Sequence, residues 1–281
     1  MHGKVVVISG GTSGIGEVAA ERLAGLGARL VLVARDRARG EATLARLRAR
    51  GPGVAHVAHY ADLSLIADTK RVAAEIAAAE PRIDVLINNA GAMFGRRLVT
   101  ADGLELTFAT NHMSYFLLTH GLRERLLASA PARVVNTSSA AHRRADLDFD
   151  DLQSTRGYRG FMAYSRSKLC NILYTRELAR RSAGTGVTAN CLHPGFVATR
   201  FGDASGGFFS YVVRASKPVF AISSEKGAET LVYLASSPEV ATISGGYFYQ
   251  CQLATPTRAA QDDAAARRLW AETARLAGLS G

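Results

Sequence analysis

Short apolar runs alternate with longer segments of helical periodicity along most of the chain. Seven runs rich in β-branched or aromatic residues predict strands at Val5–Ile8, Leu30–Val33, Val54–His59, Val85–Ile87, Val134–Asn136, Val187–Leu192 and Tyr247–Tyr249. Between them, apolar residues recur at helical spacing, as at Leu44 and Leu47. Near-continuous apolar strands separated by helices are typical of a parallel sheet covered on both faces. We therefore expect one doubly wound α/β domain over residues 1–281, built on a seven-stranded parallel sheet.

The two ends of the chain fit the same picture. Residues 256–281 have the pattern of one more amphipathic helix, in which Trp270 is expected to be a core residue or an oligomer contact. Met1–Lys4 leads directly into the first strand, and this start is too short for the apolar core of a signal peptide. No stretch reaches the roughly 18 uninterrupted apolar residues of a membrane span. The sequence thus predicts neither a signal peptide nor a membrane-spanning helix.

Composition and charge limit the classes of partner. Hydrophobic residues make up 48% of the chain and charged residues 21%, which excludes wholesale disorder. The formal net charge is +10, and residues 17–50 hold eight arginines against four acidic residues. Because that segment contains no aromatic residue on which bases could stack, we interpret it as a solvated helical surface and expect no nucleic-acid partner.

Cysteine and histidine positions bear on the cellular compartment and on metals. The three cysteines, Cys170, Cys191 and Cys251, are odd in number, widely spaced and without a CxxC motif. This pattern favours reduced thiols in a cytoplasmic protein over a disulfide framework. His56 and His59 lie on the third predicted strand without a cysteine or acidic cluster beside them, so no metal site is expected.

A glycine-rich loop, Ser9-Gly10-Gly11-Thr12-Ser13-Gly14-Ile15-Gly16, joins the first strand to a helical pattern. Glycines at such a junction allow a tight turn and let the backbone approach a pyrophosphate, which the amides and dipole of a helix N-terminus favour. The spacing is G-x3-G-x-G, and an ordinary glycine-rich turn is the alternative. The strand before the loop and the helix after it favour a dinucleotide site of the Rossmann type.

The residue after the second strand bears on the choice of dinucleotide. Folds that select NAD usually place a carboxylate there for the ribose 2′-hydroxyl, whereas an arginine accommodates the 2′-phosphate of NADP. Here the strand is followed by Arg35, with Arg37 and Arg39 close behind. These residues predict NADP(H), although the neighbouring Asp36 points the other way.

Polar residues at later strand ends and on one helix could carry chemistry. Asn88-Asn89-Ala90-Gly91 closes the fourth strand, where small and amide residues suit a crevice that a ligand passes. Tyr164 and Lys168 are four residues apart and therefore share one face of a helix. An ammonium beside a phenol lowers the pKa of the phenol and makes it usable as an acid or base. Together with the glycine loop, this pair predicts an enzyme site.

These motifs, in this order, resemble the short-chain dehydrogenase/reductase family over essentially the whole chain. The resemblance rests on Ser9-Gly10-x3-Gly14-x-Gly16, Asp62, Asn88-Asn89-Ala90-Gly91, Asn111, Ser139, Tyr164, Lys168 and Pro194-Gly195. A closer resemblance is to the retinol-dehydrogenase-like branch. It rests on Arg35-Asp36, Asn111-His112, Phe116 to Thr119, Val135 to His142, Ser167 to Leu173, His193-Pro194-Gly195, Arg267 to Trp270 and the 25-residue gap from Ser139 to Tyr164. Ser9 stands where the family usually has threonine, which keeps the hydroxyl.

The resemblance implies a catalytic role for four residues. Ser139 would hydrogen-bond the substrate oxygen, with Ser138 as the competing candidate for that role. Tyr164 would donate a proton during reduction or accept one during oxidation. Lys168 would lower the pKa of the tyrosine and hold the nicotinamide ribose, and Asn111 would position a water that connects Lys168 to solvent. Hydride would pass between nicotinamide C4 and the carbonyl carbon.

The resemblance also implies which residues contact NADP(H). Asp62 would contact the adenine, and the segment after the sixth strand would flank the nicotinamide carboxamide. The full expected set is Ser9, Gly10, Thr12, Ser13, Gly14, Ile15, Gly16, Arg35, Asp62, Leu63, Asn89, Ala90, Gly91, Tyr164, Lys168, Pro194, Gly195, Val197 and Thr199.

Three functions stay open at this level. The leading one is an NADP(H)-dependent oxidoreductase acting on a carbonyl or alcohol group of a small molecule. A catalytically silent NADP(H)-binding regulator and a C=C reductase similar to the protochlorophyllide reductases are the alternatives. In this family residues 196–224 would cover the substrate, and the segment is rich in apolar groups such as Phe208 and Phe209. It therefore predicts a lipophilic or aromatic substrate, unless these residues form core or a homo-oligomer contact.

Overall fold

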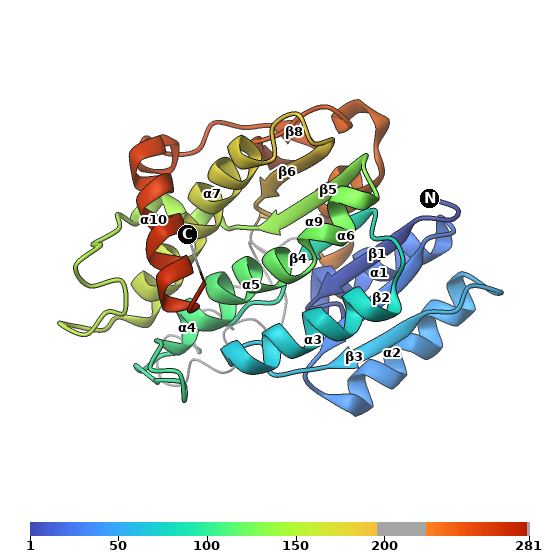
Figure 1. The fold of residues 1–281 in the computed structure, drawn as a ribbon, viewed down its shortest axis with the longest axis horizontal. Coiled ribbons are helices and arrows are strands. Elements are labelled where there is room, and N and C mark those ends of the chain that lie inside the picture. The colour runs from blue at the N-terminus through green and yellow to red at the C-terminus, as the bar shows by residue number, and fades with distance from the viewer. Residues whose placement is uncertain (196–222, 280–281) are drawn as a thin grey trace.

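The computed structural model describes residues 1–195 and 223–279 of the 281-residue chain. Its centre is one sheet with the strand order β3-β2-β1-β4-β5-β6-β7-β8 (Figure 1). The strands are β1 (Val5–Ser9), β2 (Arg29–Ala34), β3 (Val57–Tyr60), β4 (Val85–Asn88), β5 (Ala132–Thr137), β6 (Val187–Leu192), β7 (Tyr247–Tyr249) and β8 (Gln252–Leu253). The predicted doubly wound Rossmann-type sheet is therefore confirmed.

The sheet has eight strands among the described residues, not the seven that we expected. The first seven are parallel, and β8 pairs antiparallel with β7 through Phe248 and Leu253. Gln250 and Cys251, between the two strands, have φ angles of 50° and 62°. Two consecutive residues with positive φ form the tight hairpin turn that matches strand twist. A two-residue strand is too short to show alternating hydrophobicity, so the sequence pattern missed it.

Helices cover both faces of the sheet. On one face α1 (Gly14–Gly25) packs against α2 (Arg37–Arg50) and α9 (Ser224–Ser236). The other face carries α3 (Ile66–Ala79), α5 (Ser114–Gly121), α6 (Arg123–Ala128), α7 (Gly160–Arg181) and α10 (Asp263–Leu276). In Figure 1, α10 (red) lies along the outside of α7. Short pieces complete the order: α4 (Leu106–Phe108), the π-helix η1 (Ala109–Met113) and the 3-10 turns η2 (Ala140–Arg144), η3 (Pro238–Val240) and η4 (Ala259–Gln261).

Two boundaries differ from the sequence-based expectation. Strand β3 begins at Val57 rather than Val54, because the preceding residues turn and His56 Nδ1 accepts a hydrogen bond from Leu30 N. The last helix begins at Asp263 rather than at residue 256. Asp262 caps it by accepting hydrogen bonds from the amides of the second and third following residues, which fixes the start of the helix.

The described residues also bear on the cysteines, metals and membranes. Cys170 and Cys191 are buried, Cys251 is half-buried, and all three are free thiols. Within residues 1–195 and 223–279, no three His, Cys, Asp or Glu side chains gather as a metal site would require. No helix in these same ranges is both long and apolar enough to span a bilayer.

The carboxyl ends of the central strands meet at one edge. Strand β1 pairs with β2 on one side and with β4 on the other, so successive crossovers run in opposite directions from this point. Ligands of open α/β sheets bind at such a switch point, beyond the carboxyl ends of the strands. In register at this edge, Ser9 lies opposite Asn88, and Asn88 lies opposite Asn136. The predicted chemistry-bearing residues follow these positions.

Candidate functional site

The glycine loop between β1 and α1 lies directly against the segment that follows β4. Gly10 has a φ of +69°, and a Cβ there would be 2.7 Å from the Ala90 backbone. A Cβ on Gly16 would come within 2.2 Å of the Gly10 carbonyl oxygen and 2.4 Å of Asn89 Nδ2. No side chain fits at either position, so glycine is required for the close approach of these backbones.

The N-terminus of α1 faces the same edge of the sheet. Ser13 occupies the N-cap position but makes no side-chain capping hydrogen bond. The first amides of this twelve-residue helix are therefore not satisfied by a capping side chain, and the helix dipole adds partial positive charge there. Together with the space left by Gly10 and Gly16, this arrangement fits the pyrophosphate of a dinucleotide.

Ser9 and Asn89 join the glycine loop to the neighbouring strand ends. Ser9 is fully buried, and its Oγ accepts hydrogen bonds from Asn89 N at 3.1 Å and Ala90 N at 3.3 Å. Asn89 Nδ2 donates to Gly10 O at 3.1 Å, while Asn89 Oδ1 accepts from Thr137 Oγ1 at 3.1 Å. These bonds hold the ends of β1, β4 and β5 in fixed positions around the predicted cofactor site.

Arg35 and Asp36 follow β2 and are both exposed. The Asp36 carboxylate caps α2 by accepting a hydrogen bond from Arg39 N at 2.9 Å. Asp36 is thus engaged by its own helix, whereas Arg35 forms no salt bridge with any carboxylate of the described residues. The Arg37 guanidinium lies over the Tyr60 ring, 4.3 Å from its centroid. Arg35 and Arg39 therefore both present exposed guanidinium groups that form no salt bridge among the described residues.

Asp62 and Leu63 lie just after β3 and are half-buried. Asp62 Oδ1 accepts hydrogen bonds from Ser64 N at 3.0 Å and Ser64 Oγ at 2.7 Å. This turn directs the chain away from the strand end into α3. Both residues come from the strand next to β2, which places them on the same side of the switch point as Arg35.

Tyr164 lies in the first half of α7, and Ser139 follows β5. Tyr164 is 9% exposed, and a side-chain hydrogen bond connects it to Ser139. Ser139 is half-buried, and its Oγ accepts a bond from Ala141 N at 3.2 Å. Ser138 is buried and donates to Lys168 O at 2.7 Å. Of the two candidate serines, Ser139 is therefore the one that reaches the tyrosine.

Lys168 is one helical turn after Tyr164 and only 3% exposed. Its Nζ donates to Thr137 O at 3.0 Å and lies 5.7 Å from the centroids of both the Tyr164 and Tyr115 rings. Asn171 Nδ2 donates to the same Thr137 carbonyl at 3.1 Å. The end of β5 thus holds α7 through two side chains that share one acceptor.

Asn111 lies in η1, a single turn of π-helix between α4 and α5. Its Oδ1 accepts from Ala92 N at 2.8 Å, and its Nδ2 donates to Ala92 O at 2.9 Å and to Ser167 Oγ at 2.9 Å. A Cβ on Gly91 would be 3.3 Å from Asn111 Oδ1 and 3.4 Å from Lys168 Nζ. π-Turns inside helices often occur at functional sites. This one brings the amide beside the lysine and the segment after β4.

Burial shifts the pKa values of the tyrosine and the lysine in opposite directions. It raises the pKa of Tyr164 to about 12, and the hydrogen bond with Ser139 lowers that pKa only in part. It lowers the pKa of Lys168 to about 7. Burial is thus the largest influence on both pKa values, and a lowering of the Tyr164 pKa by Lys168 stays a prediction. At neutral pH the phenol is protonated.

Pro194 and Gly195 follow β6 and end the first described range. Gly195 N donates to His193 Nδ1 at 3.3 Å, and the His193 ring stacks on Tyr249 with centroids 4.1 Å apart. Val197 and Thr199, which were expected to flank the nicotinamide, lie outside the described residues. The same is true of most of the predicted substrate-covering segment.

Sequence reasoning missed several residues of this site. Thr137 carries the carbonyl that receives Lys168 and Asn171, and this backbone role leaves no trace in the residue type. Tyr115 is fully buried beside Lys168, and its hydroxyl has no hydrogen-bond partner among the described residues. Its position four residues after Asn111, on the same helix face, was the available signal. His142 Nδ1 is hydrogen-bonded to the backbone oxygen of Ser139 at 2.7 Å and so holds this segment in place.

Comparison with known proteins agrees with this geometry. The model of the short chain dehydrogenase family matches residues 4–206. Retinol dehydrogenase 14 of Homo sapiens is 42% identical over 299 aligned residues, which cover 99% of this chain and 88% of that protein. An uncharacterized protein from Mycobacterium paratuberculosis has a TM-score of 0.79 and 31% identity, with 99% of this chain and 95% of that chain covered.

A third relative is the RhlG/NADP active-site complex of Pseudomonas aeruginosa. It has a TM-score of 0.70 and 29% identity, with 88% of this chain and 94% of that chain covered. The family match and the full-length identity agree with the strand order of the sheet. The chain belongs to the short-chain dehydrogenase/reductase family of oxidoreductases, in its retinol-dehydrogenase-like branch.

Proposed function

We propose that the protein is an NADP(H)-dependent oxidoreductase that interconverts a carbonyl and an alcohol on a lipophilic small molecule, with Tyr164 as general acid and base. One observation carries this proposal. Tyr164, its hydrogen-bond partner Ser139, and Lys168 lie together where β5 and α7 meet, close to the segment after β4 that contacts the glycine loop. Such a cluster beside a dinucleotide cradle suits proton transfer coupled to hydride transfer.

The residues present fit a dinucleotide. Gly10 and Gly16 leave the space, the N-terminus of α1 offers amides, and Arg35 offers a cation to the 2′-phosphate. When bound, the nicotinamide would supply or accept the hydride. Preference for NADP(H) is supported by the position of Arg35 and by the commitment of Asp36 to its helix cap. It is also supported by the NADP complex of RhlG.

The chain's own residues would supply the proton and stabilise the reacting oxygen. Tyr164 is a neutral phenol at pH 7, which is the form that donates a proton to a developing alkoxide. The Ser139 hydroxyl accepts from Ala141 N and is hydrogen-bonded to Tyr164, and it would donate its proton to the substrate oxygen once that oxygen lies beside the phenol. Donors fixed in advance at that oxygen stabilise the transition state more than the ground state. Lys168 adds positive charge beside the phenol, and Asn111 keeps the neighbouring backbone in place.

Two alternatives make different predictions. A silent NADP(H)-binding regulator would bind the nucleotide without turnover of any carbonyl or alcohol. A C=C reductase of the protochlorophyllide-reductase type would consume NADPH but leave the carbonyl intact. The intact set of Ser139, Tyr164 and Lys168, gathered where β5 and α7 meet, favours the carbonyl reaction over a silent protein.

The proposed substrate class rests on composition and on relatives. Between residues 201 and 222, outside the described ranges, the sequence carries many aromatic and aliphatic side chains and few charges. Retinol dehydrogenase 14 is named for a lipophilic alcohol. A pocket walled by such side chains would favour long apolar substrates, because each buried CH₂ contributes about 0.8 kcal/mol. We propose that residues 196–224 supply this wall.

The experiment is a series of straight-chain aldehydes of increasing length, assayed by NADPH absorbance with product analysis. We expect alcohols as products and kcat/KM rising with chain length. Nucleotide binding without turnover across aldehydes, ketones and alcohols would favour the silent regulator. Reduction of an enone only at its C=C bond would favour the C=C reductase. A flat series with alcohol products would keep the reaction and remove the lipophilic substrate class.

Cofactor choice is tested separately with Arg35→Asp. A charge-assisted hydrogen bond to phosphate contributes about 1.5–3 kcal/mol, which corresponds to roughly ten- to a hundredfold in affinity. The variant should weaken NADPH binding by about that factor and NADH binding much less, as measured by fluorescence titration. Arg48→Asp, at an exposed position further along α2, is the matched control. Equal affinity of the unmodified protein for NADH and NADPH would contradict the proposal.

A further inference from the structure

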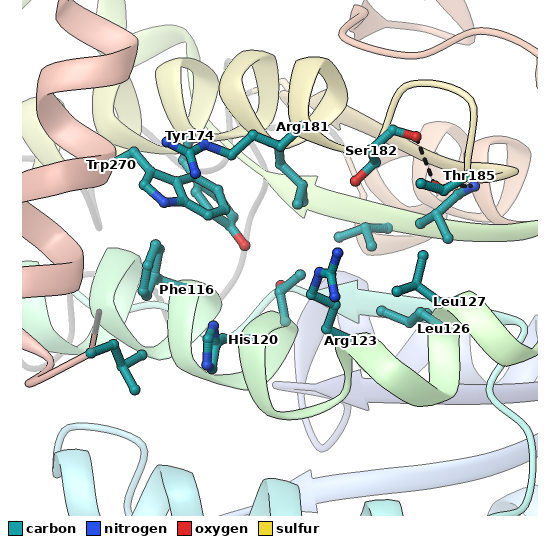
Figure 2. Close-up of a pocket in the computed structure, with 15 residues that line it drawn as sticks. Phe116, His120, Arg123, Leu126, Leu127, Tyr174, Arg181, Ser182, Thr185 and Trp270 are labelled. Carbon is teal, nitrogen blue, oxygen red and sulfur yellow. Dashed lines mark hydrogen bonds between the residues drawn. The ribbon is translucent and has the colours of Figure 1, made fainter. Parts of the chain in front are cut away.

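A second concave site lies far along α7 from the tyrosine. A cavity of about 440 Å³ opens between α5 and α6 on one side and α7 and α10 on the other, and we call it the α5–α7 cavity. Figure 2 shows Phe116, His120 and Arg123 facing Tyr174 and Arg181 across it. Ten residues of helix separate Tyr164 from Tyr174, or about 15 Å along the axis. The cavity therefore does not belong to the proposed catalytic site.

The inner part of the α5–α7 cavity is apolar and aromatic. Val134 of β5 and Val187 of β6 reach it from the sheet. Phe116 and Trp270 make an edge-to-face contact with centroids 5.0 Å apart, and Tyr174 stacks on Trp270 at 5.7 Å. Aromatic groups that pack against one another give a preformed wall rather than one that must be ordered on binding. The volume lies in the range of small-molecule sites, roughly 300–1,000 Å³.

The mouth of the cavity is basic. Arg123, Arg181 and His120 line it, and no carboxylate is among the described residues that do. The Arg181 guanidinium lies over Trp270 at 4.4 Å, and its Nε donates to Glu177 Oε1 at 2.7 Å. Glu177 also binds Arg180, so one carboxylate serves two arginines and leaves a positive excess. Arg123 has only the exposed Glu124 beside it, a pair that contributes little.

We propose that the α5–α7 cavity binds an amphiphilic anion, with an apolar chain or ring against Phe116 and Trp270 and a single acidic group between Arg123 and Arg181. An apolar interior and a cationic mouth together match that chemical class, because a neutral lipid would leave the arginines unused and a compact polar anion would leave the aromatic wall bare. The inference does not depend on the proposed catalytic function.

A second copy of the chain is the competing occupant. A twofold contact buries the same surface of both copies, so it would bring the two positively charged cavity mouths into one interface. Like charges brought together in this way oppose association. A separate anionic ligand removes that repulsion instead of creating it.

The chain contains one tryptophan, Trp270, so its fluorescence reports on this cavity alone. We would titrate the full chain with decanoate, kept below its micelle concentration, and with decan-1-ol as the uncharged match. A saturable change in Trp270 fluorescence with decanoate is expected, and decan-1-ol should bind at least fivefold more weakly. Sedimentation at the same concentrations records the oligomeric state.

Arg123→Gln is the informative variant, because it removes charge from the mouth without touching Trp270. Decanoate affinity should fall at least fivefold, whereas decan-1-ol affinity should stay unchanged. Arg48→Gln, on the exposed side of α2, is the control and should behave as the unmodified protein. Thermal melting checks that both variants fold.

Three results would overturn the proposal. The first is no saturable Trp270 response to decanoate. The second is equal affinity for decanoate in the unmodified protein and in Arg123→Gln. The third is a Trp270 change that follows dimer formation rather than decanoate concentration, which would assign the cavity to a second copy.

Discussion

At the scale of single residues, three consecutive positions at the end of β5 have three different roles. Thr137 offers its carbonyl to Lys168 and Asn171, Ser138 donates to the backbone of α7, and Ser139 reaches Tyr164. The sequence predicts a serine at this place, and alternation along a strand puts neighbouring side chains on opposite sides. Which of the two serines faces the tyrosine depends on where the strand ends, and only the structure shows that.

Exchanging the two serines one at a time separates catalysis from packing. Ser139→Ala should lower kcat by roughly 10²–10³, because it removes a fixed donor at the reacting oxygen. Ser138→Ala should keep kcat within a few-fold and cost about 1 kcal/mol of unfolding free energy, since it loses one buried hydrogen bond. Steady-state kinetics and urea unfolding of both variants measure the two effects. The reverse pattern would move the catalytic role to Ser138.

Lys168 should make stability depend on pH. Its pKa is about 7 in the folded chain against 10.5 ordinarily, so between these values the unfolded chain binds a proton that the folded chain does not. Unfolding free energy contributed by this group therefore rises as pH rises from 7 to 10.5. Lys168→Met removes the penalty, so its stability advantage should be largest below pH 7. The advantage should shrink by on the order of 3 kcal/mol between pH 7 and pH 9.

Urea unfolding of the two proteins at pH 6, 7, 8 and 9, without added nucleotide, checks this prediction. Taking the difference between the proteins cancels the other titrating groups. A difference that stays constant with pH would show that Lys168 keeps an ordinary pKa in the folded chain.

At the scale of elements, α7 contributes residues to both the proposed catalytic site and the α5–α7 cavity. Its first half carries Tyr164 and Lys168, and its second half carries Tyr174 and Arg181 of the α5–α7 cavity. Sequence periodicity predicts the existence of such long elements well. It does not predict the π-turn η1, because that turn is set by the three hydrogen bonds of Asn111 to groups distant in sequence. The strand β8 escapes for a different reason, because two residues are too few to show alternating hydrophobicity.

His112 joins η1 to α10. Its Nε2 is 2.9 Å from Thr273 Oγ1, and complete burial lowers its pKa to about 4 from 6.5. As pH falls from 6.5 to 4 the unfolded chain gains a proton that the folded chain does not, so unfolding free energy falls across this window. His112→Gln keeps an amide donor for the threonine. Over the same pH window, this variant should lose less unfolding free energy than the unmodified protein, by on the order of 3 kcal/mol.

Denaturant unfolding between pH 7 and pH 4 measures how the unfolding free energy of the unmodified protein and of His112→Gln depends on pH. His193, whose pKa is also lowered to about 4, is present in both proteins and drops out of the difference. Identical slopes would mean that His112 does not resist protonation in the folded chain.

At the scale of the whole molecule, site residues that are far apart in the sequence lie together at the carboxyl edge of the sheet. Residues from 9 to 168 meet there because parallel strands end on the same side, and this convergence follows from the fold class that the apolar pattern predicts. Protonation states, in contrast, do not follow from the fold class. The pKa of Tyr164 depends on how completely the rest of the chain buries it, and no local motif carries that information. The α5–α7 cavity likewise arises from four helices that meet only in the folded chain.

Substitution of Tyr164 tests the central claim most directly. Tyr164→Phe removes only the hydroxyl that would exchange the proton, and Tyr158→Phe is the matched control. Tyr158 is a half-buried tyrosine whose pKa is also raised to about 12, but its hydroxyl donates to Phe94 O outside the site.

The measurement is NADPH-dependent reduction of the best aldehyde, together with NADPH affinity, for the three proteins. We predict that Tyr164→Phe loses at least a factor of 10² in kcat, since general acid catalysis contributes roughly 10²–10⁴. Its NADPH dissociation constant should stay within about twofold of the unmodified value, and Tyr158→Phe should keep its kcat. A Tyr164→Phe protein that turns over at the unmodified rate would contradict the assignment of the acid and base.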